Sequence, residues 1–108
     1  MDKSYTREKL RIALQFLVRA GPLRKRLRLA FYSLHTLTPN DFPVEDARAR
    51  LDELVCMLTS GEPKFPDESV VYVSTRDMTN AQAQRAANLI VELMCDLTRD
   101  CEAQGPNE

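Results

Sequence analysis

The chain has 108 residues, of which 44% are hydrophobic and 29% are charged, so it fits one globular domain and is too short for two. No apolar run approaches the roughly 20 residues that a membrane-spanning helix needs, and the polar N-terminus lacks the apolar core of a secretory signal, so we expect a cytoplasmic protein with no membrane partner. Residues 1–39 carry nine basic and two acidic side chains, whereas residues 40–108 carry six basic and fourteen acidic ones. This uneven charge is the most unusual property of the chain.

Two amphipathic helices are predicted in the basic half. The first spans about residues 7–20, where apolar side chains recur at helical spacing. Gly21 and Pro22 then form a stop, because glycine tolerates the left-handed conformation and proline suits the first position of the next helix. The second helix spans about residues 22–37, and the pair is expected to form an antiparallel hairpin.

The acidic half is predicted to hold two further helices. One begins near Val44 and ends at Gly61, and its acidic first turn suits the positive end of the helix dipole. The last helix spans about residues 80–101, because Thr79-Asn80-Ala81-Gln82 matches a capping box. We expect one helical domain over residues 1–101 and a flexible tail over residues 102–108.

Residues 69–77 are ambiguous. The run 70–73, Val-Val-Tyr-Val, favours a strand by propensity, but no second strand-like run exists to pair with it. Asp67 or Ser69 can instead cap a short helix, which we favour slightly over a strand that pairs with its copy in a dimer. The predicted fold class is therefore all-α: a small four-helix bundle-like domain with an additional short helix or strand near residues 69–77.

A loop over residues 62–67 places Phe65 between Pro63 and Pro66. Two prolines in so short a stretch exclude regular secondary structure. Phe65 is then either a plug that packs the loop onto the domain or an exposed anchor for a partner. Because lone loop aromatics usually pack inward, we expect the plug.

No catalytic, cofactor or metal site is predicted, and we expect a protein that is not an enzyme. The only histidine, His35, is expected to be a partly buried helix residue. Cys56, Cys95 and Cys101 form no C-x-x-C pair and fall on or beside apolar stripes, so we expect free cysteines packed in the core. The three glycines are isolated, which excludes a glycine-rich phosphate loop.

A basic cluster is the candidate binding site. Its cations crowd the start of the second helix, which is the wrong end for positive charge, and extend onto the first helix if a hairpin forms. Three interpretations stay open: pairing with the acidic helices or a second subunit, an acidic protein partner, or the phosphate backbone of a nucleic acid. The members of the cluster are Arg11, Arg19, Arg24, Lys25, Arg26 and Arg28.

These patterns favour a small non-catalytic protein-interaction module, of the kind found in adaptors, regulatory subunits and inhibitor or immunity-type proteins. A protein partner with an acidic surface is expected. A homodimer is also possible, because the wide apolar arc over residues 10–18 leaves a flank for a second chain. The alternative function is nucleic-acid binding through the basic second helix. Few side chains near the start of that helix read base edges, so contact with phosphates is favoured over sequence recognition.

Overall fold

Five α-helices and one 3-10 turn make up the computed structural model, which describes residues 3–103. No strand occurs in this part of the chain, so the all-α prediction is confirmed, whereas the more specific bundle-like arrangement stays a prediction. Most of the predicted tail, residues 104–108, lies outside the described residues. The elements are α1 (Lys3–Leu17), α2 (Leu23–Leu34), η1 (Pro39–Asp41), α3 (Glu45–Leu58), α4 (Val70–Asp77) and α5 (Asn80–Ala103).

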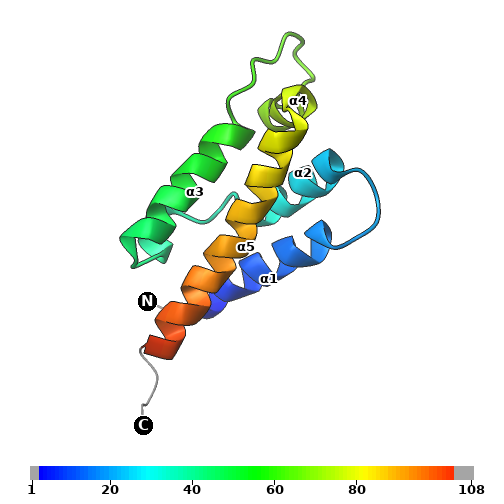
Figure 1. Cartoon of the computed structure of the whole chain (residues 1–108). Coiled ribbons are helices and arrows are strands. Elements are labelled where there is room, and N and C mark those ends of the chain that lie inside the picture. The colour runs from blue at the N-terminus through cyan, green and yellow to red at the C-terminus, as the bar shows by residue number, and fades with distance from the viewer. Residues whose placement is uncertain (1–2, 104–108) are drawn as a thin grey trace.

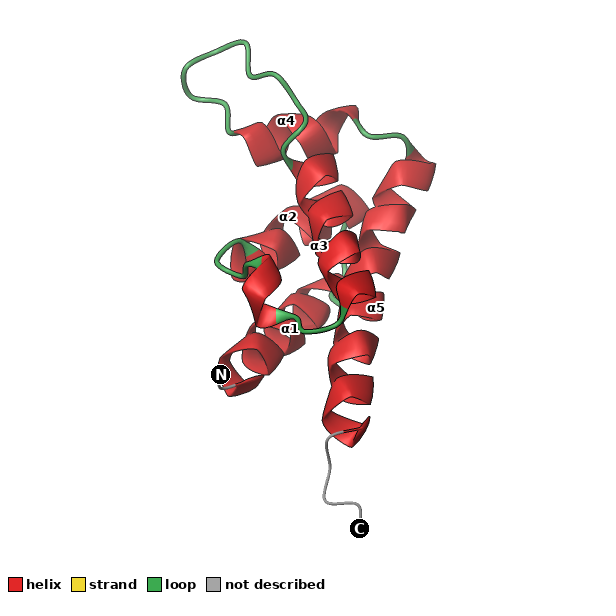
Figure 2. Cartoon of the chain, turned by 90° about the vertical axis from the view of Figure 1, so that its left-hand side faces the viewer, coloured by secondary structure: helices red, strands yellow, loops and turns green. Residues whose placement is uncertain are grey.

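The longest helix, α5, runs along the molecule and contacts three of the others (Figure 1). Helix α3 packs along one side of α5, and the hairpin of α1 and α2 packs on another. The short helix α4 lies against α2 and α3 at the end where α5 begins. The loop that joins α3 to α4, residues 59–69, projects beyond the helices at this same end, with its two ends held close to α4 (Figures 1 and 2).

The core is built from the apolar stripes that the sequence pattern predicts. In α5, Ala83 and Ala86 are fully covered, and their small side chains allow the neighbouring helices to approach closely. The bulk of the core comes from leucine and isoleucine side chains that are less than 2% exposed: Leu10, Leu27, Leu34, Leu54, Leu58, Leu89, Ile90 and Leu93.

The hairpin helices differ from their predicted bounds. Helix α1 begins at Lys3 rather than near residue 7, so Thr6 lies inside the helix and is only 1% exposed. The helix ends at Leu17 rather than near residue 20, and the turn that follows uses Gly21 at a φ of +118°. Only glycine adopts such a conformation at little cost, which explains why it stands in this turn.

Residues 70–77 form the helix α4, and the strand alternative is wrong for this segment. The Oγ atom of Ser69 accepts the backbone N–H of Tyr72 at 2.9 Å, which caps the first turn. Val73 is buried against the core, and this tertiary contact outweighs the strand propensity of the valine-rich run.

The capping box at the start of α5 is confirmed. The backbone N–H of Thr79 donates to Oε1 of Gln82 at 2.9 Å, and the N–H of Gln82 donates to Oγ1 of Thr79 at 3.1 Å. Thus each side chain satisfies a backbone group that the first turn of the helix leaves unpaired.

Arginines also join α3 to α5. Arg50 on α3 forms an ion pair with Glu92 at 3.1 Å and a second one with the nearly buried Asp96. The charges of these two helices are therefore partly satisfied within the same pair of helices.

Candidate functional site

The cations of the predicted basic cluster contact different parts of the chain. Arg11 pairs with Glu8 on its own helix, with 2.5 Å between Nη2 and Oε2, and this hydrogen bond raises the pKa of Arg11. Arg19 stacks over the ring of Phe16, with its guanidinium carbon 4.3 Å from the ring centroid. Lys25 is exposed to solvent.

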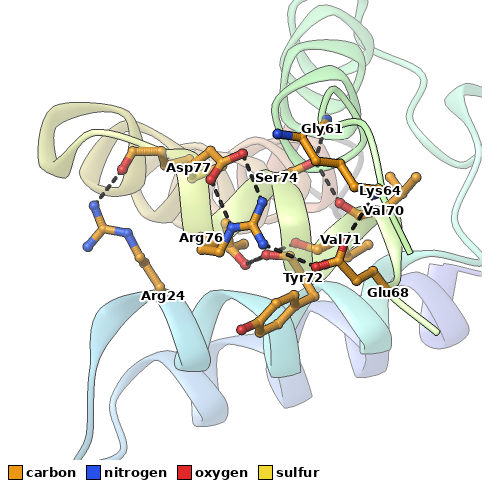
Figure 3. A network of polar contacts seen from close by, with 12 residues as sticks. Arg24, Gly61, Lys64, Glu68, Val70, Val71, Tyr72, Ser74, Arg76 and Asp77 are labelled. Atoms are coloured by element: carbon orange, nitrogen blue, oxygen red, sulfur yellow. Dashed lines mark hydrogen bonds and ion pairs between the residues drawn. The ribbon is translucent and has the colours of Figure 1, made fainter. Parts of the chain in front are cut away.

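Two arginines of α2 reach across to α4. Arg24 donates from Nη2 to the carbonyl oxygen of Met78 at 2.5 Å and extends from α2 towards the end of α4 (Figure 3). One turn further along, Arg28 donates from Nη1 to the hydroxyl of Thr75 at 3.1 Å. These bonds attach α4 to the hairpin.

Arg26 points the other way, towards the end of α1. Its Nε atom donates to the carbonyl oxygen of Gly21 at 2.9 Å, and its Nη1 atom donates to the carbonyl oxygen of Leu17. The last carbonyls of a helix carry partial negative charge, so a guanidinium is favourable beside them. The cation that is unfavourable for the start of α2 therefore stabilises the end of α1.

The described part of the chain pairs no carboxylate with Arg24, Arg26 or Arg28. Their partners are carbonyl and hydroxyl oxygens, which fix the side chains without cancelling their charge. Arg24 and Arg28 thus both contact the α4 segment, whereas Arg11, Arg19 and Arg26 contact residues of the hairpin.

The loop between α3 and α4 presents an aromatic side chain to solvent. Phe65 is 63% exposed, so the expectation of an inward plug is wrong. The loop rises above the helices in both views of the fold (Figures 1 and 2). The remaining interpretation of the sequence, an exposed anchor, agrees with this position.

Glu68 holds the loop in shape. Its carboxylate accepts the backbone N–H of Lys64 at 2.9 Å and pairs with Nη1 of Arg76 at 3.2 Å, so it connects the loop to α4 (Figure 3). The N–H of Glu68 in turn donates to the carbonyl of Phe65 at 3.1 Å. The hydrogen bond from Lys64 and the nearby Arg76 guanidinium lower the pKa of Glu68 although partial burial opposes them.

The loop also lies tightly against α4 at its start. The N–H of Gly61 donates to Oγ of Ser74 at 2.8 Å. A Cβ atom on Gly61 would lie only 2.7 Å from the backbone nitrogen of Ser74, so this approach requires glycine. Both ends of the loop are thereby fixed to the same short helix.

Beside the loop lies an open cavity of about 730 Å³ between the end of α3, the loop, α4 and the start of α5. Cys56, Met57 and Met78 supply apolar and sulfur atoms, and four charged side chains, two acidic and two basic, also line it. Phe65 does not line the cavity. The full lining is Cys56, Met57, Ser60, Gly61, Glu62, Lys64, Ser74, Arg76, Asp77, Met78 and Gln82.

The cysteine and histidine expectations need correction. Cys56 and Cys95 are exposed, because they lie just outside the buried stripes of α3 and α5. The side chain of Cys101 lies outside the described residues. His35 is also exposed, at the C-terminal cap of α2, where its Nδ1 atom lies 2.7 Å from the carbonyl oxygen of Tyr32.

A ring and two guanidinium groups form a small stack beside the loop. The guanidinium carbons of Arg28 and Arg76 lie 5.0 and 5.9 Å from the centroid of the Tyr72 ring, which is 43% exposed. Such cation–π contacts favour fixed side-chain positions at a surface. The residues around the base of the loop are therefore ordered by polar and aromatic contacts at once.

Residues 3–103 contain no group of three or more potential metal ligands, and none of their helices is long and apolar enough to cross a membrane. No family model, no curated protein and no solved structure matches the chain.

Sequence reasoning found Phe65 but not the cavity beside it. The signal for the loop was the Pro63–Pro66 pair, which excludes regular structure. The cavity depends on contacts between α3, α4 and α5, which no local pattern in the sequence encodes.

Replacing Arg26 with Met should lower the free energy of unfolding by about 1 kcal/mol, because the donors to Leu17 and Gly21 are lost while helix propensity is nearly unchanged. Lys25→Met, one residue away and exposed, is the matched control and should change stability by only a few tenths of a kcal/mol. Urea unfolding of both variants measures the difference. Equal effects would contradict the stabilising role of the Arg26 hydrogen bonds to Leu17 and Gly21.

The stabilising contacts of Glu68 with Lys64 and Arg76 should depend on pH. Since the pKa of Glu68 is lowered in the folded chain, its stabilising contribution is complete above the ordinary carboxyl pKa and is lost as the pH falls through the lowered value. An NMR titration should show the amide of Lys64 following a transition below the ordinary glutamate value. In Glu68→Gln this transition should disappear, and a wild-type midpoint at or above the ordinary value would contradict the assignment.

Proposed function

We propose that this chain is a non-catalytic protein-interaction module, and that it binds its partner with the end of the molecule formed by the loop 59–69 and the adjoining cavity. The observation that carries the proposal is the exposure of Phe65 on a loop that is tied to α4 at both ends. Large aromatic side chains supply much of the binding energy in protein interfaces.

The rigidity of the loop supports this role. Pro63 and Pro66 restrict the backbone on either side of Phe65, and Glu68 fixes the turn between them and α4. An anchor that is already held in place loses little conformational entropy on binding, so more of its contact energy appears as affinity. A loop whose aromatic residue had no binding role would gain stability by packing it inward.

The surroundings of Phe65 also suit a protein partner. The cavity beside it is lined by thioether and thiol groups together with charged side chains, and protein interfaces likewise combine apolar and polar groups. Met57 and Met78 adapt well to an incoming apolar side chain, since the methionine side chain is flexible and polarisable.

A photo-crosslinking residue such as benzoylphenylalanine, placed at position 65 in cells that make the chain, tests the proposal. We expect protein adducts at position 65 because this side chain is the anchor. Position 32 is the matched control, since Tyr32 is also an exposed aromatic residue, 50% exposed, on α2. Equal labelling at both positions, or no protein adduct at position 65, would contradict the proposal.

The alternative, contact of the basic second helix with nucleic-acid phosphates, stays a prediction. It is favoured only by the absence of carboxylate partners for Arg24, Arg26 and Arg28 among the described residues. Retention on a nucleic-acid column that falls steeply with salt and weakens in Lys25→Glu would support it. Lys25 is the residue to change because Arg24 and Arg28 also hold α4.

A further inference from the structure

We infer that the partner is a second copy of this chain, and that Phe65 of each copy fills the cavity of the other. This inference rests on the proposed function and names the occupant of the proposed docking surface. It is carried by one juxtaposition: the loop that carries the exposed Phe65 also forms one wall of an open cavity, which Met57 and Met78 help to line.

The Phe65 ring and the cavity are complementary, but within one chain the ring does not line the cavity. The loop residues Glu62 and Lys64 line the cavity, whereas Phe65 does not. The bonds of Glu68 to Lys64 and Arg76 hold the backbone of the turn in the form in which Phe65 is exposed. A second chain can supply the ring while the turn keeps this form.

The cavity is suited to a benzyl group. Its volume of about 730 Å³ exceeds what one aromatic side chain requires, and it is open to solvent. Met57 and Met78 provide thioether sulfurs, which make favourable contacts with aromatic rings. Filling it would cover apolar surface on both chains at once.

The charges at the cavity favour a second copy over a strongly charged partner. Glu62 and Asp77 are acidic and Lys64 and Arg76 are basic, so the lining carries two charges of each sign. A uniformly acidic or basic surface would meet two like charges there, which opposes binding. A second copy brings the same balanced set, and a two-fold axis allows the acidic side chains of one copy to face the basic side chains of the other.

A two-fold arrangement makes every contact twice. If Phe65 of one chain enters the cavity of its partner, symmetry places the partner's ring in the first chain's cavity as well. The Phe65 ring and the cavity can therefore be altered separately. Phe65→Ala removes the ring. Cys56→Trp narrows the cavity, because Cys56 is an exposed residue of the cavity wall.

Analytical ultracentrifugation of the purified full chain under reducing conditions tests the inference. Reducing agent prevents disulfides through the exposed Cys56 and Cys95. Wild type is expected to dimerise, and Phe65→Ala should weaken the dimer about 30-fold or more, as the loss of a central aromatic anchor does. Cys56→Trp should weaken it likewise, and Tyr32→Ala, the matched aromatic control on α2, should leave it unchanged. Circular dichroism confirms that all variants keep their helices.

Mixing the two weakened variants gives the most specific result. Phe65→Ala keeps an intact cavity and Cys56→Trp keeps an intact ring, so an equimolar mixture can make one of the two contacts. We expect the mixture to associate at concentrations where neither variant does alone. Failure of this rescue, a wild type that is monomeric up to its solubility limit, or a Phe65→Ala chain that dimerises normally would each overturn the inference.

The outcomes also separate this inference from the proposed function. A monomeric wild type that forms adducts with a different protein at position 65 would overturn the second-copy inference and leave the docking surface in place. A chain that dimerises but shows equal adducts at positions 65 and 32 would contradict the docking surface and therefore the inference that rests on it.

Discussion

The surface proposed for binding depends on one carboxylate. Glu68 accepts a backbone N–H from the loop and pairs with Arg76 on α4, so the loop and the helix form one unit. Without this link, the loop would keep its prolines but lose its connection to the body of the protein. Phe65 would then be free to collapse onto the apolar atoms of the cavity, and neither the exposed ring nor the open cavity would persist.

The helix on which the loop depends is itself held in place from the hairpin. Helix α4 has eight residues, which is too short to be stable alone. The hydrogen bonds of Arg24 and Arg28, together with the cap at Ser69, fasten it to α2 and begin its first turn. The uneven charge of the chain therefore has a structural use: Arg24 and Arg28 of the basic half donate to uncharged oxygen atoms of Met78 and Thr75 in the acidic half.

Much of the fold could be predicted from the sequence because helices have a strong local signature. The left-handed glycine at Gly21 and the capping box at Thr79 and Gln82 depend on neighbouring residues only, and the structure shows both, although α1 ends earlier, at Leu17. Whether residues 70–77 form a helix or a strand was harder to predict. The burial of Val73 decides between the two, and burial is a property of the whole fold.

The candidate site was less predictable, for a physical reason. Whether Phe65 packs inward depends on Glu68 and Arg76, which are three and eleven residues away, and on the space left by three helices. The basic cluster illustrates the same limit, since a run of cations shows where charge lies along the chain but not which oxygen atoms each side chain will reach.

The central claim is that Glu68 keeps the loop 59–69 ordered with Phe65 presented to solvent, and backbone ¹⁵N relaxation measures this most directly. In the wild-type chain, the heteronuclear NOE values of Lys64, Phe65 and Glu68 should be close to those of the helices. In Glu68→Ala the values for Lys64 and Phe65 should fall, while those of α1 and α5 stay unchanged. A wild-type loop as mobile as an unfolded segment, or a variant loop as ordered as the wild type, would contradict the account.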